Sequence, residues 1–270
     1  MKLKNLVVGF SVLVLGLGLS GCSTKQASTD TSLSDVKKAG KLVVVTESEF
    51  APFEFKTLVD GKDTLVGADI ELAKAIGDKL GVEVEFSVLS FDNVLASLQA
   101  GKADIAIAGI SVTDERKQVF DFSDTYYQSK NTVLVQKADL EKYTDSSSLS
   151  GLTVGVQKGS VQETVAKDQL AGASIVSLTG TSEMINELKS GQLNAVVLEE
   201  PIAQGYIDNN AELVFATFSL DSSESDAYAI ALPKGSDALK AEINEVIAEL
   251  TSSGQYDQFV TDAYQLSVSK

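Results

Sequence analysis

The sequence predicts an α/β protein of two similarly built lobes that face a common cleft. Short runs rich in β-branched residues alternate with amphipathic stretches that end at glycine, a pattern typical of strands and helices in turn. A helix–glycine–strand unit also occurs twice, at a spacing of 90 residues. Its matching positions are Leu95, Leu98, Gly101 and Asp104 in the first copy and Ile185, Leu188, Gly191 and Asn194 in the second. Two such units predict two lobes, and a C-terminal tail that returns to the first lobe would create a hinge of two chain crossings.

The N-terminus predicts a secretory signal followed by a tether. Lys2 and Lys4 precede a short apolar stretch over 6–19, which ends in LSGC. This stretch is shorter than the roughly 20 apolar residues of a membrane span. The LSGC end resembles a lipobox, so we expect a signal peptide over 1–21 and a lipid on Cys22, the only cysteine. The polar segment that follows predicts a flexible, lipid-anchored linker over 22–34.

The first lobe is expected over 35–125 and again over 227–270. Residues 41–46 read KLVVVT and predict its first strand, because β-branched residues favour strands. Asp69 should cap a helix that ends at Gly81. The other elements expected here are a strand over 82–88, a helix from Ser90 or Asp92 to Gly101, a buried strand over 103–108, a late strand over 228–232, and two C-terminal helices over 236–251 and 256–264.

The second lobe is expected over 126–226. Its first strand should lie over 132–136. The run LTVGVQKGS over 152–160 predicts a strand that passes through a glycine-containing turn into a helix starting near Val161. Ser182 should cap the next helix, which ends at Gly191 and leads to a strand over 194–198.

Composition excludes several classes of function. The chain has 22 lysines and arginines against 38 aspartates and glutamates, a formal net charge of −16. Such a surface argues against nucleic acid or anionic lipid as a partner. Histidine, the usual general base and the commonest metal ligand, is absent from the sequence. We therefore expect no metal, no cofactor and no catalytic residue.

Polar residues follow the predicted strands at the ends where ligands bind in open α/β sheets. Gly109, Ser111 and Arg116 follow the strand over 103–108. Glycine lets backbone approach a ligand, and arginine presents a planar fork that fits a carboxylate. The alternative is a turn glycine and a solvated arginine. The 90-residue repeat places Glu199 opposite Gly109, at the corresponding strand end.

Two further stretches carry similar alternatives. The helix starting near Val161 presents N–H groups that suit a carboxylate, or it is an ordinary strand-to-helix turn. Phe50 follows the first strand, as either a core residue or a platform for a ligand.

The motifs taken together resemble a known family. They are the lipobox, EFAPFEF, GADIELAKAIGDKLG, GKADIAIAGISVTDERKQVFDFSDTYY, VGVQKGS, LEEP, ALPKGS and SSGQYDQF. In this order they are similar to the extracellular solute-binding proteins of family 3, the polar amino-acid binding proteins of bacterial ABC importers. The resemblance implies the type II periplasmic-binding-protein-like fold, with a ligand cleft between two lobes joined by a two-strand hinge.

The resemblance also implies which residues hold the ligand backbone. Gly109, Ser111 and the Arg116 guanidinium would hold the α-carboxylate. The N–H near Val161 would reach it from the other lobe, and Glu199 would accept from the α-ammonium. Two more residues of the same turn, Ser160 and Gln162, would lie nearby. The chain departs from the common pattern at Glu199, where the family usually has aspartate, at Gly109, often serine, and at Val161, often threonine or glycine.

The ligand side chain would lie between Phe50 and Phe91, with Glu47 at its distal end. An acid there favours a cation, so arginine is expected first, followed by lysine, histidine or glutamine. The implied function is a monomeric, extracytoplasmic lipoprotein, anchored to the cell membrane by its N-terminal lipid, that delivers an L-amino acid to a membrane permease. The alternatives are an enzyme on the same scaffold, such as a cyclohexadienyl dehydratase, and a glutamine-type binding protein.

Overall fold

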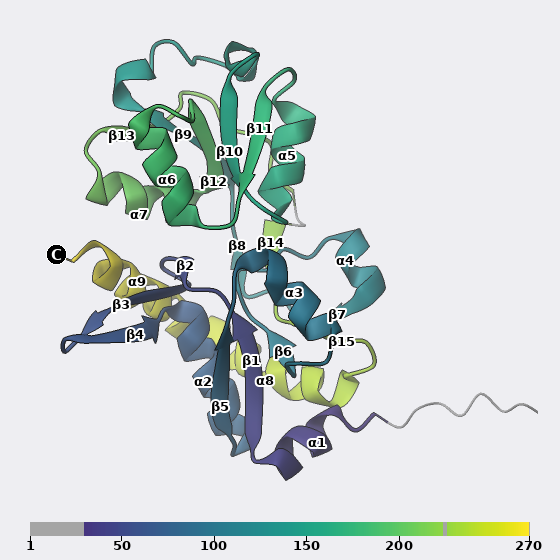
Figure 1. Ribbon diagram of the computed structural model, residues 1–270. Coiled ribbons are helices and arrows are strands. Elements are labelled where there is room, and N and C mark those ends of the chain that lie inside the picture. The colour runs from purple at the N-terminus through teal and green to yellow at the C-terminus, as the bar shows by residue number, and fades with distance from the viewer. Residues whose placement is uncertain (1–29, 224–225, 270) are drawn as a thin grey trace, which may run out of the picture.

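The computed structural model describes residues 30–223 and 226–269, and it shows two α/β lobes connected by a narrow hinge (Figure 1). The sheet of lobe 1 has the order β5-β1-β6-β15-β7. Its strands are β1 (Lys41–Thr46), β5 (Glu83–Val88), β6 (Ile105–Ala106), β7 (Phe120–Phe122) and β15 (Ala231–Pro233). β1 is parallel to β5 and β6, whereas β15, from the C-terminal part of the chain, pairs antiparallel with β6 and β7. The two-lobed α/β fold class is therefore confirmed.

Lobe 2 repeats this plan with the strand order β11-β10-β12-β9-β13. Its strands are β9 (Asn131–Gln136), β10 (Thr153–Gln157), β11 (Ser174–Leu178), β12 (Ala195–Glu199) and β13 (Leu213–Phe215). Its helices are α5 (Val161–Gln169), α6 (Thr181–Ser190) and α7 (Glu200–Asn209), with short 3-10 turns at Lys137–Asp139 and Ser146–Leu149. β10 is parallel to both β11 and β12.

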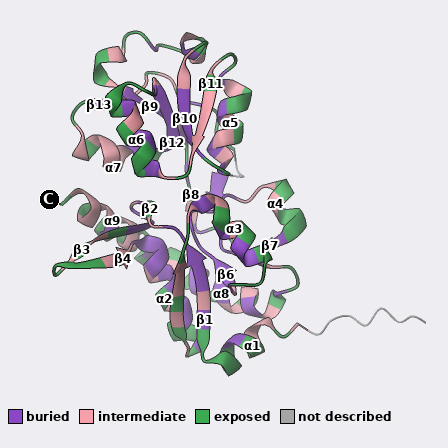
Figure 2. Cartoon of the chain, viewed as in Figure 1, coloured by how far each residue is buried: buried purple, intermediate pink, exposed green. Residues whose placement is uncertain are grey.

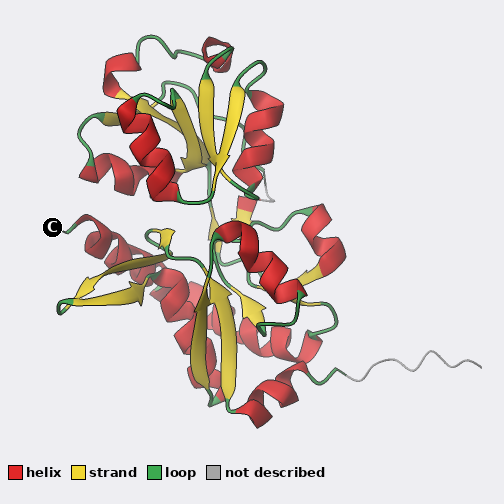
Figure 3. Cartoon of the chain, in the orientation of Figure 1, coloured by secondary structure: helices red, strands yellow, loops and turns green. Residues whose placement is uncertain are grey.

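The helices of lobe 1 come from both ends of the chain. They are α1 (Ser32–Ala39), α2 (Ala68–Leu80), α3 (Phe91–Gln99), α4 (Asp114–Val119), α8 (Asp237–Ser252) and α9 (Gln255–Val268). Figure 3 shows helices packed around each sheet, and Figure 2 shows that the central strands of the two sheets are mostly buried, whereas edge strands such as β5 and β11 are partly exposed. Within the described ranges, none of the helices combines the length and the apolar character needed to cross a membrane.

The repeat seen in the sequence has a structural cause. Asp104 precedes β6, and its Oδ2 accepts a hydrogen bond of 2.8 Å from the Val43 N–H of the neighbouring β1. Asn194 precedes β12, and its Oδ1 accepts one of 3.0 Å from the Thr153 N–H of β10. The two side chains thus fix the same strand pairing in each lobe.

Two antiparallel segments form the hinge. β8 (Tyr127–Gln128) leads the chain out of lobe 1, and β14 (Ala227–Tyr228) leads it back. The Tyr126 N–H donates to the Tyr228 carbonyl at 2.9 Å, which extends this pairing into lobe 1.

Most predicted elements are present, but the predicted caps at Asp69 and Ser182 are wrong. Ser182 lies inside the first turn of α6, whose N-cap is Gly180. Gly67 occupies the N-cap of α2 with φ 134°, and a Cβ there would lie 2.0 Å from the Phe53 carbonyl oxygen. Asp69 lies instead inside the first turn and is fully buried. Its carboxylate accepts hydrogen bonds of 2.8 Å each from the hydroxyls of Tyr126 and Tyr256.

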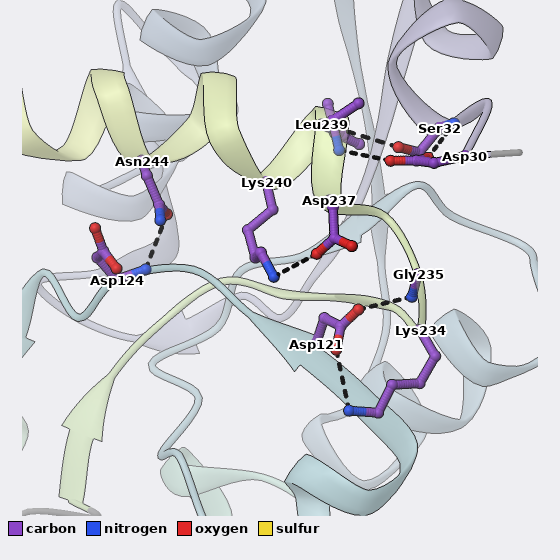
Figure 4. A network of polar contacts seen from close by, with 11 residues as sticks. Asp30, Ser32, Asp121, Asp124, Lys234, Gly235, Asp237, Leu239, Lys240 and Asn244 are labelled. Atoms are coloured by element: carbon purple, nitrogen blue, oxygen red, sulfur yellow. Dashed lines mark hydrogen bonds and ion pairs between the residues drawn. The ribbon is translucent and has the colours of Figure 1, made fainter.

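The prediction of a flexible linker is also wrong for its last part, residues 30–34, because this segment is hydrogen-bonded to α8. Asp30 Oδ2 accepts the Ala238 N–H at 2.6 Å, and Ser32 Oγ accepts the Leu239 N–H at 3.3 Å (Figure 4). These contacts cap the N-terminus of α8, so the segment gains order from a helix distant in sequence. The predicted signal peptide and Cys22 lie outside the described residues.

Several elements were not predicted: the small sheet β2–β4, the helices α1, α4 and α7, and the strands β7, β11 and β13. β2 (Glu49–Phe50), β3 (Glu54–Val59) and β4 (Lys62–Val66) form a separate antiparallel sheet. The outer part of this hairpin is largely exposed and polar, so it has little apolar periodicity to reveal it. α7 begins directly after β12, and its Pro201 is compatible with the first helical turn.

Candidate functional site

The carboxyl ends of the central strands of the two lobes point toward each other (Figure 1). Glu47 directly follows β1 in lobe 1, and Gln157 is the last residue of β10 in lobe 2. The Gln157 Nε2 donates to both Glu47 carboxylate oxygens, at 3.1 Å each. Both residues are buried, with 3% and 4% of their surface exposed. The two strand ends therefore meet in one region between the lobes.

Burial dominates the titration of Glu47. It raises the pKa of this carboxyl to about 8, against the opposing effect of the Gln157 hydrogen bond, and nearby Glu49 and Glu199 raise it further. Sequence reasoning found Glu47 but missed Gln157. Gln157 could have been recognised as a candidate because it is the last residue of a buried strand and is followed by a polar turn.

Arg116 also connects the two lobes. Its Nη1 donates to the Ser111 carbonyl at 2.8 Å, and its Nη2 donates to the Gly159 carbonyl of lobe 2 at 3.1 Å. The guanidinium carbon lies 5.8 Å from the centre of the Phe91 ring. Burial lowers the pKa of Arg116 to about 10, so the group remains a cation at neutral pH.

Glu199 ends β12 and is 4% exposed. Burial raises its pKa to about 7, helped by the negative charge of Asp226, while the positive charge of Arg116 acts in the opposite direction. Glu199 also contributes to raising the pKa of Glu47. Glu199 thus interacts electrostatically with both Glu47 and Arg116 in the region between the lobes.

Gly109 and Phe50 pack directly on each other. Gly109 has φ 53°, and a Cβ there would lie 2.8 Å from Phe50 Cε1. The Gly109 N–H donates to Asp69 Oδ2 at 3.2 Å, which fixes the orientation of this peptide. Ser111 is 3% exposed and forms a bridge with Tyr228 of the hinge. The Phe50 side chain is therefore buried beside the Gly109 backbone, with 3% of its surface exposed.

The start of α5 uses its side chains within lobe 2. Ser160 is the N-cap, and its Oγ accepts the Glu163 N–H at 3.2 Å while donating to the Gln157 carbonyl at 2.7 Å. The Gln162 Nε2 donates to Asn131 Oδ1 at 2.9 Å. The N–H groups of Val161 and Gln162 lie in the first helical turn, where helix geometry provides no intrahelical acceptor.

Two hollows lie elsewhere on the molecule. One of about 520 Å³ borders Lys130 and the segment 215–222 in lobe 2, and one of about 400 Å³ lies between Glu49 and Tyr206. Their linings, as far as the described residues show, include neither Glu47 nor Arg116. A few precisely placed polar groups fix the orientation of a small ligand and provide specificity. The candidate site is therefore the charged region between the strand ends. Among residues 30–223 and 226–269, no three His, Cys, Asp or Glu side chains are grouped to hold a metal ion.

Comparison with known proteins identifies the family of the chain. Residues 42–264 match the model of the bacterial extracellular solute-binding proteins, family 3, and the chain belongs to this family. It is 32% identical to the arginine-binding extracellular protein ArtP of Bacillus subtilis, over 89% of this chain and 90% of that protein.

Solved structures are similar over most of the chain. One is an amino acid ABC transporter substrate-binding protein, AbpA, from Streptococcus pneumoniae bound to L-arginine, with a TM-score of 0.85, 50% identity and coverage of 88% of this chain and 100% of that one. Another is the ancestral amino-acid-binding protein AncCDT-1, a precursor of cyclohexadienyl dehydratase, with a TM-score of 0.77, 33% identity and coverage of 86% and 99%.

Proposed function

We propose that this chain is the substrate-binding lipoprotein of an ABC importer, which closes on one L-amino acid, preferably arginine, and delivers it to a membrane permease. The observation that carries the proposal is the convergence of buried Glu47 and Glu199 with Arg116 at the junction of the lobes. The arginine-binding relatives support the choice of ligand.

The charges fit the two ends of an α-amino acid. Arg116 offers a guanidinium for the α-carboxylate, and Ser111 with the first turn of α5 adds donors from both lobes. Glu199 offers an acceptor for the α-ammonium. Because these groups come from different lobes, the ligand stabilises the closed form through contacts that the open form lacks.

Glu47 is assigned to the side-chain end of the ligand. A guanidinium or ammonium beside it would favour the ionised carboxylate, whereas a neutral side chain would leave the carboxyl with the Gln157 amide. Phe50 and Phe91 would line the path of the ligand side chain. A glutamine-type ligand is the neutral alternative.

The N-terminal assignments complete the proposal. A signal peptide over 1–21 and a lipid on Cys22 would hold a monomer at the outer face of the cell membrane. Lobe 1 would comprise 35–125 and 227–270 together with residues 30–34, which contact α8, and lobe 2 would comprise 126–226. The hinge segments β8 and β14 lie close to these limits.

Calorimetry against the twenty amino acids tests the proposal. We expect one tight site for L-arginine and recovery of the ligand unchanged by mass spectrometry. A carboxyl with a pKa near 7, such as Glu199, could also serve as a general acid, and AncCDT-1 is described as the precursor of an enzyme. Conversion of a bound ligand would therefore favour the enzyme, and failure to bind any amino acid would refute the proposal.

A further inference from the structure

A carboxylate of lobe 1 lies at the start of a helix in lobe 2, outside the candidate ligand site. Glu49 is in β2, and its Oε2 accepts the Ser182 N–H at 3.1 Å. Ser182 is in the first turn of α6. Figure 1 shows β2 below the end of α6 that faces lobe 1. Both residues are exposed, so the contact lies at the rim of the junction between the lobes.

The start of α6 has no side-chain cap within its own lobe. Its N-cap is Gly180, and glycine has no side chain that could accept from the first-turn N–H groups. A Cβ at Gly180 would lie 3.0 Å from Glu49 Oε2, so the carboxylate occupies the space beside the cap. By contrast, α5 is capped by its own Ser160. A carboxylate at a helix N-terminus is favoured both as a hydrogen-bond acceptor and by the helix dipole.

We propose that Glu49 is a further residue on which ligand affinity depends, and that it acts without touching the ligand, by capping α6 across the lobe boundary in the closed form. When the lobes separate, both the carboxylate and the Ser182 N–H exchange this contact for water. The cap therefore favours the closed form whichever amino acid is bound. Its effect on affinity rests on the proposed function, whereas the contact itself does not.

This role makes a distinct prediction about selectivity. A residue that contacts the ligand side chain changes the affinity ratio between two ligands, as Glu47 is expected to do. A residue that acts only on closure changes both affinities by the same factor. L-Arginine and its uncharged analogue L-citrulline distinguish the two cases, because they differ mainly in the charge at the end of the side chain.

The test uses Glu49→Ala in the full chain, with Glu83→Ala as the matched control. Glu83 is an exposed glutamate at the start of β5 in lobe 1, so the charge change is the same. For Glu49→Ala we expect the calorimetric Kd of both ligands to rise by a common factor of roughly three to ten, the range set by the loss of a helix cap. We expect no change for Glu83→Ala.

A second substitution separates closure from simple support of α6. Gly180 has φ −112° and ψ 134°, which serine adopts readily, so Gly180→Ser would give α6 its own cap in both open and closed forms. Added to Glu49→Ala, it should leave the Kd raised, because the new cap stabilises the open and closed forms equally. Recovery of the Kd would overturn the proposal, as would unequal losses for arginine and citrulline.

A measurement on the ligand-bound protein separates this proposal from the proposed function. With saturating L-arginine, which holds the lobes closed, the solvent exchange rate of the Ser182 amide, followed by NMR, should be higher in Glu49→Ala than in the wild type and unchanged in Glu83→Ala. An unchanged rate in Glu49→Ala would refute the cap while leaving the proposed function intact, whereas failure of the wild type to bind any amino acid would refute the proposed function.

Discussion

Replacing Glu47 by glutamine tests how the protein would select a cationic ligand. The side chain is 3% exposed, and its pKa of about 8 means that the neutral form predominates at pH 7 in the unliganded site. Ionising it at pH 7 costs about 1.4 kcal/mol, one pKa unit. A bound guanidinium offsets this because it favours the carboxylate, so arginine binding should release close to one proton from Glu47.

The affinity for arginine should rise with pH. Arginine needs ionised Glu47, and the ionised fraction rises with pH. Its affinity should therefore increase by up to about tenfold per pH unit below pH 8 and level off above it. Glu199, with a pKa of about 7, adds a similar trend for every ligand that has an α-ammonium group. The ratio of arginine to citrulline affinity isolates the contribution of Glu47.

Calorimetry in buffers of different ionisation enthalpy measures both affinity and proton release. For the wild type, arginine should release nearly one proton more than citrulline at pH 7. In Glu47→Gln, arginine should lose about 2 kcal/mol or more, roughly 30-fold in Kd, and the difference in proton release should vanish. Citrulline should change much less. Equal losses for the two ligands, or equal proton release in the wild type, would refute this role for Glu47.

Three further predictions concern the surrounding residues. Arg116→Ala should weaken arginine binding by ~100-fold or more, because it leaves the α-carboxylate without its cation, and near-native affinity in calorimetry would contradict this. Gly109→Ala should lower the unfolding free energy by about 1–3 kcal/mol in denaturant titration, because φ 53° is strained and the added Cβ meets Phe50; unchanged stability would argue against that packing. Burial and neighbouring carboxylates raise the pKa of Glu54 well above its usual value, so the folded protein loses stability as pH rises above the unfolded pKa. Glu54→Gln should therefore stabilise the protein more at pH 8 than at pH 5 in thermal unfolding, and an equal effect at both values would contradict the assignment.

Local patterns predicted the parts of the fold that depend on local sequence. The strand over 41–46 and the helix ends at Gly81 and Gly191 are as expected, because β-branched runs and left-handed glycines act within a few residues. The 90-residue repeat predicted the two lobes because Asp104 and Asn194 fix equivalent strand pairs.

Contacts between distant segments could not be predicted in this way. Asp69 resembles a helix cap in sequence, but it is buried because Tyr126 and Tyr256 supply donors from the hinge region and the C-terminal helix. Gln157 ends a strand and Glu49 begins a short edge strand, and the sequence around each residue indicates only a strand next to a turn. Their partners lie in the opposite lobe, so their roles depend on how the two lobes meet.

The most direct test of the central claim is a titration that compares L-arginine with agmatine, which keeps the guanidinium but has no α-carboxylate. If Arg116 and the α5 turn hold that carboxylate between the lobes, arginine should bind at one site per chain and agmatine at least ~100-fold more weakly. Equal affinity for the two compounds would show that the carboxylate is not recognised, and it would contradict the account.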